Sequence, residues 1–218
     1  DIKLLQRVEV THISHDGNFI GFVSNTGLIV RGRRAIITAP AAQSACLLAN
    51  ICPELSATAE HATYDPCWTI MLGLEHDISR DADPIQKYFP IRDETAGIAF
   101  AVPETLRNAG YTNRTKPTAP ALTIQASGNW SQAHLHHDSK TVIHLLCAIW
   151  TKISGQTIPP IVDATAHRWL YAKVTRTALD TAPHLSADGK IAIAGDWLGG
   201  PRVEDAFNSG LAAYRSLS

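Results

Sequence analysis

The feature that most constrains the fold is a short apolar run near the end of the chain, followed by a glycine turn and a helix. Ile191 to Ala194 is apolar and β-compatible, which predicts a buried strand, and Gly195-Asp196 follows at its carboxyl end. Gly199-Gly200 permits close approach of backbone amides, and Pro201 suits the first position of a helix. The free amides of that helix would face the edge at which open α/β sheets bind ligands.

Beyond Pro201, two sets of residues recur at helical spacing. The larger apolar side chains are Val203, Phe207, Leu211 and Tyr214, and the small residues that allow close packing on a sheet are Ala206, Ser209, Gly210 and Ala213. A strand, glycine turn and helix also occur in many α/β proteins that bind nothing there, so the interpretation depends on the rest of the chain.

Composition excludes several classes of function. With 218 residues, 45% hydrophobic content and a formal charge of −1, the chain can build a core but has no basic field for nucleic acid. No apolar stretch is long enough to span a bilayer, and the first residues are no signal peptide, so we expect a cytoplasmic enzyme. The four cysteines form no CxxC pair and are expected to be reduced thiols. Because the chain opens on Asp1 and then Ile2-Lys-Leu-Leu, we expect its beginning to be missing.

Turn signals and apolar runs predict the order of elements. Runs at 8–13, 19–24 and 28–30 predict a β-meander, 35–39 a buried strand closed by Pro40, and 41–50 a helix. Runs at 67–74, 98–102 and 122–126 predict an antiparallel sheet. Asp138 or Ser139 would cap a helix ending before Gly155, and 166–172 reads as a strand. We therefore predict an α/β plus α+β fold in which residues 1–52 and 186–218 form one domain around an inserted domain, 53–185.

Four ordered motifs then resemble a known family. Tyr64 to Glu75, Thr123 to Ser131, His167 to Ala172 and Gly195 to Glu204 resemble the bacterial renalase-like flavoproteins, a branch of the flavin-containing amine oxidases. The likeness runs from about Val8 to Leu217. It implies noncovalent FAD in a Rossmann-like domain and a substrate domain whose sheet covers the flavin ring. It also implies hydride transfer to the flavin and reoxidation by oxygen, with a small molecule, either a dihydronicotinamide isomer of NAD(P)H or an amine, as substrate.

The resemblance also implies cofactor contacts. Asp196 would meet the ribityl or pyrophosphate part of FAD, and Val10, in a Val-x-x-Ile pattern, would lie against the adenine. The other implied cofactor-binding residues are Pro40, Gly195, Gly200, Arg202, Val203 and Glu204, the last three at the start of a helix aimed at the isoalloxazine. That placement agrees with physics, because a helix N-terminus stabilises negative charge on a reduced flavin. Arg202 and Glu204 could equally form an ordinary ion pair.

Three residues of one predicted strand are the candidate catalytic group. Alternation places His167, Trp169 and Tyr171 on one face. His167 could relay a proton or be an interior histidine with one satisfied ring nitrogen. Trp169 and Tyr171 could wall the substrate pocket or simply fill a core. We assign no metal, because the group from His134 to Asp138 reads as a solvated turn, and no hydrolase, because a GxSxG elbow is absent.

One departure from the family matters for function. The N-terminal GxGxxG fingerprint, the principal seat of the dinucleotide, is absent from this sequence, and the segment from Pro103 to Pro120 also differs from the family pattern. The alternative hypothesis is therefore a flavin-free remnant that binds a small ligand or a partner. Such a chain would expose an apolar sheet edge, so we expect a homo-oligomer or association with a missing N-terminal segment.

Overall fold

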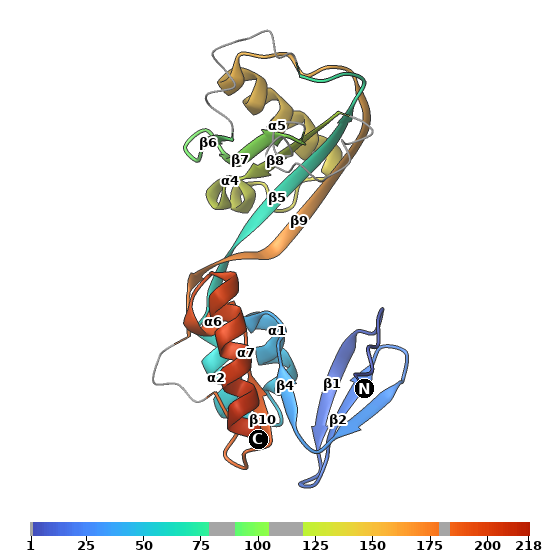
Figure 1. Ribbon diagram of the computed structural model, residues 1–218, viewed down its shortest axis with the longest axis vertical. Coiled ribbons are helices and arrows are strands. Elements are labelled where there is room, and N and C mark those ends of the chain that lie inside the picture. The colour runs from blue at the N-terminus through green and yellow to red at the C-terminus, as the bar shows by residue number, and fades with distance from the viewer. Residues whose placement is uncertain (1, 79–89, 105–119, 179–183) are drawn as a thin grey trace. The chain divides into compact units, whose positions relative to one another are not determined.

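The computed structural model describes residues 2–78, 90–104, 120–178 and 184–218, which fall into two compact units (Figure 1). Unit 1 comprises residues 1–64 and 174–218, and unit 2 comprises residues 65–173. The first boundary lies later than the expected position after residue 52 because a second helix, α2 (Pro53–Glu60), packs on α1 (Ala41–Leu48). The Ser56 hydroxyl donates a hydrogen bond to the Ala45 carbonyl across that contact at 2.9 Å.

Unit 1 begins with the predicted β-meander. Strands β1 (Val10–His15), β2 (Ile20–Ser24) and β3 (Ile29–Gly32) form an antiparallel sheet in that order. Gly17 (φ +91°) and Gly27 (φ +81°) make the two turns, because both have a left-handed backbone that favours glycine. Ile13 and Ile20 are fully buried in the core of the unit.

A parallel pair of strands forms the centre of unit 1. β4 (Ala35–Ile37) lies beside β10 (Ile191–Ile193), which is buried at every residue. The other edge of β10 is bridged by Leu185, which pairs with Ala192. The described part of the chain thus shows the predicted buried strands as a two-stranded parallel sheet.

The polypeptide after β10 differs from the prediction. A short helix, α6 (Asp196–Gly199), comes first, and the long helix α7 (Val203–Leu217) begins two residues after Pro201, which therefore lies outside it. Gly200 (φ +153°) separates the two helices. The Arg202 backbone N–H donates a hydrogen bond to the Asp205 carboxylate at 3.1 Å, which closes the first turn of α7.

The packing of α7 was predicted only in part. Ala213, one of the predicted small residues, is buried against Ala192 and Ala194 of the β10 region together with Leu217. Val203, Phe207 and Tyr214, three of the predicted larger apolar residues, are exposed.

Unit 2 is built on a five-stranded sheet of order β6-β7-β8-β5-β9, and the predicted antiparallel sheet is confirmed for β7 with β8 and β8 with β5. The unpredicted strand β6 also pairs antiparallel with β7. The strands of the sheet are β5 (Thr63–Leu74), β6 (Ile91–Asp93), β7 (Ile98–Pro103), β8 (Ala121–Ala126) and β9 (Ile161–Arg176). Helices α4 (Gly128–Ala133) and α5 (Ser139–Ser154) complete the unit. The segment from Pro103 to Pro120, which differs from the family pattern in sequence, lies mostly outside the described residues.

Helix α5 has the predicted caps and buried face. The Asp138 side chain accepts a hydrogen bond from the Thr141 backbone N–H at 3.0 Å, and Gly155 ends the helix in the left-handed conformation at φ 68°. Val142, Leu146 and Trp150, spaced by four residues, are fully buried against the sheet. Sequence-local signals therefore determined both ends and the orientation of this helix.

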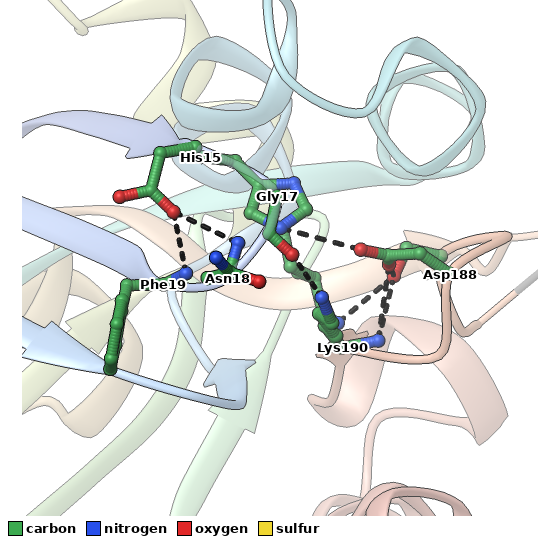
Figure 2. A network of polar contacts seen from close by, with 9 residues as sticks. His15, Gly17, Asn18, Phe19, Asp188 and Lys190 are labelled. Carbon is green, nitrogen blue, oxygen red and sulfur yellow. Dashed lines mark hydrogen bonds and ion pairs between the residues drawn. The ribbon is translucent and has the colours of Figure 1, made fainter.

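A polar network joins the meander to the turn that precedes β10. Figure 2 shows His15 and Gly17 facing Asp188 and Lys190. The Lys190 ammonium donates a hydrogen bond to the Gly17 carbonyl, and His15 Nε2 lies 3.3 Å from an Asp188 carboxylate oxygen. The latter contact is electrostatic, because its geometry is not that of a hydrogen bond. The Ser186 hydroxyl also donates to Asp188 at 2.6 Å.

This network predicts a loss of stability in acid. The Ser186 hydroxyl, with smaller contributions from the Lys190 backbone N–H and from the charges of His15 and Lys190, holds the pKa of Asp188 below its ordinary value. The ionised form is thus favoured in the folded state, so its contribution is complete above the unfolded pKa of about 4 and is lost as pH falls through the lower folded pKa. Because Asp188 is 38% exposed, we expect Asp188→Asn to lower the free energy of unfolding at pH 7 by only about 0.5–1 kcal/mol.

Urea unfolding of both proteins at neutral and acid pH checks this expectation. The difference between wild type and Asp188→Asn should shrink as the pH falls below about 4. A difference that does not change with pH would contradict it.

Candidate functional site

Unit 2 contains a pocket of about 440 Å³ beside the ends of β5 and β8 and the middle of β9. Its polar and aromatic lining residues are Asp65, Cys67, Glu94, Gln125, Trp169, Tyr171 and Lys173, and the backbone of Gly128 closes one side. The walls therefore combine aromatic rings with three charged groups of mixed sign, Asp65, Glu94 and Lys173. A concave site of this size and composition can hold a small organic molecule.

Two of the three predicted catalytic residues line this pocket. Trp169 and Tyr171 are 53% and 36% exposed on β9, so they do not fill a core. His167 lies outside the lining but beside it, because its ring packs edge-on against Trp169 with 4.2 Å between ring centroids. The interpretation of His167 as an interior histidine is wrong, since the side chain is exposed on a strand with most of its residues open to solvent.

The structure adds acidic residues that the sequence prediction missed. Asp65 and Glu94 bring two carboxylates to the pocket and Lys173 one ammonium, which gives the lining a balance of −1. None of these three forms an ion pair with another described residue. Asp65 stood inside the first family motif, but nothing in its local pattern places it opposite Glu94, which is about thirty residues further along the chain.

Gly128 holds Asp65 in place by having no side chain. A Cβ atom at Gly128 would lie 2.5 Å from Asp65 Oδ2 and 2.7 Å from its Cγ. Gly128 is the first residue of α4, which Ser127 caps by accepting a hydrogen bond from the Trp130 backbone N–H. The glycine thus lets the carboxylate lie directly over the start of the helix.

Cys67 contributes a thiol to the wall of the pocket. Burial raises the pKa of its thiol, and the thiol lies 3.5 Å from the Ala126 carbonyl, to which it can donate. At neutral pH the Cys67 thiol is therefore uncharged and forms a weakly polar part of the pocket wall. We assign it no nucleophilic role, because only the thiolate is a good nucleophile.

The predicted cofactor-binding glycines lie in unit 1, where the chain's own side chains explain them. A Cβ atom at Gly195 would lie 2.4 Å from Trp197 Nε1, and one at Gly200 would lie 2.6 Å from Asp205 Oδ2. The expectation that the Gly199-Gly200 pair leaves room for a ligand is not met at Gly200, because Asp205 occupies that space. Asp196 is half-buried at the start of α6, and its carbonyl accepts a hydrogen bond from the Gly200 backbone N–H at 2.9 Å.

The remaining predicted cofactor residues are in unit 1 as well. Arg202, Val203 and Glu204 are exposed at the start of α7, and no ion pair joins Arg202 to Glu204 in the described structure. Pro40 precedes α1, next to Ala39, whose carbonyl accepts a hydrogen bond from Trp197 Nε1 at 3.3 Å. Pro40 therefore lies near the Gly195 turn.

Val10 begins β1, and its half-buried side chain packs against the core of unit 1.

The histidine-rich turn from His134 to Asp138 contributes to packing, because the His134 ring stacks on Trp130 with 3.9 Å between ring centroids. No group of three or more histidine, cysteine or acidic residues among the described positions could hold a metal ion. In the same residues, no helix has both the length and the apolar character that a membrane crossing requires.

Comparison with known proteins decides the family. The model of the family described as flavin containing amine oxidoreductase matches residues 3–215. This chain belongs to that family. The likeness to the renalase branch remains an expectation from the sequence motifs.

Solved structures of similar fold include three oxidases. They are an Exiguobacterium protein assigned as a protoporphyrinogen oxidase (TM-score 0.62, 16% identity), cyclohexylamine oxidase from Brevibacterium oxydans (0.60, 10%) and a redesigned putrescine oxidase (0.59, 12%). Each match covers 96% of this chain but only 45%, 47% and 48% of the respective oxidase. At these identities the likeness shows the fold, and this amine oxidoreductase chain spans less than half the length of the proteins it matches.

The residues of this chain fit only part of the FAD that the family implies. The start of α7 offers exposed first-turn residues at the positive end of a 15-residue helix, which suits the electron-rich edge of a flavin. The sequence has no glycine-rich loop of the GxGxxG type, which is the element that binds the pyrophosphate of a dinucleotide. The residues of this chain therefore fit the flavin edge better than the pyrophosphate.

Proposed function

We propose that this chain is the substrate-binding portion of an FAD-dependent oxidoreductase of renalase or amine-oxidase type. The proposal is based on the pocket of unit 2. Trp169 and Tyr171 line this pocket together with the carboxylates of Asp65 and Glu94. The reaction proposed is oxidation of the substrate by two electrons, for which bound FAD would supply the hydride acceptor and oxygen the final oxidant, with hydrogen peroxide as its product. The side chains of the pocket bind and orient the substrate.

The charges of the pocket rank the two candidate substrate classes. A protonated amine gains from two carboxylates in a partly enclosed site, where charge interactions are stronger than in open water. The aromatic walls of Trp169 and Tyr171 suit either a cation or the planar ring of a dihydronicotinamide isomer. Lys173 opposes the cation, so the net preference for an amine is modest, and amines are the class to test first.

FAD would be held jointly in this proposal. The chain contributes Asp196 and the α7 start at Arg202, Val203 and Glu204, while a polypeptide segment with the dinucleotide fingerprint contributes the seat of the pyrophosphate. The hydrogen bond from Trp197 Nε1 to the Ala39 carbonyl joins the segment around Pro40 to the segment around Gly195 in unit 1. This supports the proposal that the residues this chain contributes to FAD lie together. Val10 would contact the adenine side.

The visible absorption spectrum of the purified chain, before and after addition of FAD, tests the proposal. A bound flavin that an arylalkylamine or a dihydronicotinamide isomer bleaches under nitrogen, and that oxygen restores, would support it and identify the substrate class. The same test is repeated with a co-expressed GxGxxG-containing segment if the chain alone stays colourless. A chain that retains no flavin in either case would overturn it.

A second candidate function is a flavin-free module that binds a small ligand or a partner protein. It is favoured by the absent fingerprint and by the occupation of the space at Gly195 and Gly200 by Trp197 and Asp205. Both functions predict that phenethylamine binds the pocket, so the flavin distinguishes them: the module binds the amine in calorimetric titration but retains no FAD, even with the co-expressed GxGxxG-containing segment.

Gly128 provides a specific test of the pocket. In Gly128→Ala the new methyl group collides with the Asp65 carboxylate and displaces it, so the affinity for phenethylamine should fall about tenfold, as expected when one charge-assisted contact is lost. Helix α4 should not be weakened, since alanine is the better helix former. Calorimetric titration measures the change.

The matched control is Gly73→Ala in β5 of the same sheet, where a Cβ atom would make only ordinary contacts of 3.5 Å with Val162 and Asp163. Its affinity for the amine should stay within about twofold of wild type. Equal affinities for the two variants would show that Asp65 does not contact the ligand.

A further inference from the structure

The charged groups of the unit 2 pocket stand on two different sides of strand β5. The sheet order β8-β5-β9 places β5 in the middle, with β8 and β9 as its two neighbours (Figure 1). Asp65 of β5 leans toward the β8 side, because its Oδ2 lies 2.5 Å from the position that a Cβ atom would take at Gly128, which follows β8. Lys173 belongs to β9, on the other side of β5.

Glu94 lies on the same side of the pocket as Asp65. The turn between β6 and β7 carries Glu94 and is held against the start of α4, because the Ser127 backbone N–H donates a hydrogen bond to the Gly97 carbonyl at 2.9 Å. Gly128, over which the Asp65 carboxylate lies, is the next residue along the chain. We name Asp65 and Glu94 the acidic side of the pocket.

The other side of the pocket is aromatic and basic. Trp169, Tyr171 and Lys173 alternate along β9, so their side chains share one face of the strand, and all three line the pocket. We name these three residues the basic side. Because β8 and β9 are separated by two strand spacings, the two sides of the pocket lie about 10 Å apart.

This separation leaves charges of both signs open to a ligand. Asp65, Glu94 and Lys173 form no ion pair with another residue in the described ranges. A ligand with only an ammonium group satisfies the acidic side but is repelled by the Lys173 ammonium. A ligand with an anionic group at its other end gains at both sides.

The width of the pocket indicates how far apart the two charges of such a ligand should be. Hydrogen bonds of about 3 Å at each end, taken from a width of about 10 Å, leave about 4 Å between the ammonium and the anionic group. An α-amino acid carries both groups on one carbon, which is too close. A ligand with several bonds between them fits, and its apolar middle part can lie against Trp169 and Tyr171.

We propose that the unit 2 pocket selects amines that carry an anionic group several bonds away from the ammonium, and that Lys173 determines this specificity. The inference rests on the proposed function, in which the same pocket binds the substrate amine. The ammonium lies between Asp65 and Glu94, and the anionic group reaches Lys173.

Calorimetric titration of the 218-residue chain with three related ligands tests the inference. Phenethylamine has no anion, 4-(2-aminoethyl)benzoate is the same molecule with a carboxylate at the far end of the ring, and L-phenylalanine has the carboxylate beside the amine. At low salt the benzoate should bind about fivefold more tightly than phenethylamine, the gain expected for an exposed ion pair. That gain should shrink at high salt. L-Phenylalanine should show no gain, because its carboxylate would lie at the acidic side.

Variants of Lys173 separate specificity from a structural role. Lys173→Met should bind the benzoate about fivefold more weakly than wild type and phenethylamine slightly more tightly, so the ranking of the two ligands is lost or reversed. Lys173→Arg keeps the positive charge and should keep the ranking. A purely structural role for Lys173 would lower both affinities together. The matched control is Lys140→Met, because Lys140 is exposed at the start of α5 and lies outside the pocket lining.

The outcomes distinguish this inference from the proposed function. If phenethylamine and the benzoate bind wild type equally, the inference is overturned and the proposed function stands, because the amine still binds. If neither ligand binds, both are overturned. A benzoate advantage that persists in Lys173→Met, or a gain shown by L-phenylalanine and not by the benzoate, would also overturn the inference.

Discussion

Replacing Trp197 with alanine is expected to lower the free energy of unfolding by about 3–5 kcal/mol. The indole is 1% exposed and packs in the core of unit 1, where its Nε1 donates a hydrogen bond to the Ala39 carbonyl at 3.3 Å. Removal of the ring leaves a cavity beside Gly195, whose missing side chain already accommodates the indole. Urea unfolding followed by far-UV circular dichroism measures the change without relying on tryptophan fluorescence.

Trp197→Phe is the matched control, because it keeps an aromatic ring and loses the hydrogen bond to Ala39. Its cost should be about 1–2 kcal/mol, well below that of the alanine variant. If both variants were as stable as wild type, the indole would not be a core residue and the contact at Gly195 would need another explanation.

Trp150→Ala should destabilise unit 2 by a similar amount, about 3–5 kcal/mol. Trp150 is fully buried at the end of the α5 stripe formed with Val142 and Leu146. Its Nε1 finds no acceptor among the described residues, so the side chain stabilises the fold through its ring and not through a hydrogen bond. Trp150→Phe should therefore cost only about 1–2 kcal/mol, the value expected for a smaller ring in a packed site.

Trp169→Ala provides the contrasting case in the same unit. Because Trp169 is 53% exposed, its loss should change the free energy of unfolding by no more than about 0.5 kcal/mol. It should nevertheless weaken binding of an aromatic amine to the pocket, since the indole forms one wall. A large stability loss for Trp169→Ala, or a small one for Trp150→Ala, would contradict this division between packing and binding.

The division matters because the sequence alone left the roles of Trp169 and Tyr171 open. Trp169 and Tyr171 could wall a pocket or fill a core, and period-two alternation is the same in both cases. Burial in the folded chain separates them, since Trp169 is largely exposed and lines a pocket whereas Trp150 is enclosed. The proposal for substrate binding therefore depends on a feature that only the folded chain provides.

Much of the fold was nevertheless predictable, because it depends on local chemistry. The turns at Gly17 and Gly27 need a left-handed backbone, Asp138 caps α5, and Gly155 ends it. Each of these signals acts within a few residues, so the sequence shows it directly. The buried strand at Ile191 was equally clear from its apolar run.

The candidate site was less predictable, because its residues meet only through long-range packing. Asp65 and Glu94 come from separate parts of unit 2, and no local pattern joins them. Gly199-Gly200 was expected to let backbone amides approach a ligand, whereas in the folded chain the Asp205 carboxylate takes the space beside Gly200. A missing side chain is visible in a sequence, but the group that takes its place is not.

The sequence by itself determined most of the strands, the turns of the meander, the caps of α5 and the family motifs, but not the short elements α2, α4, α6 and β6. Tertiary structure alone decided which side of α7 is buried, because periodicity defines the faces of a helix without saying which face meets a neighbour. Ala213 and Leu217 pack against Ala192 and Ala194, whereas Val203, Phe207 and Tyr214 remain exposed. The alanines at this contact let the helix lie close to the strand, since only small side chains permit such close packing.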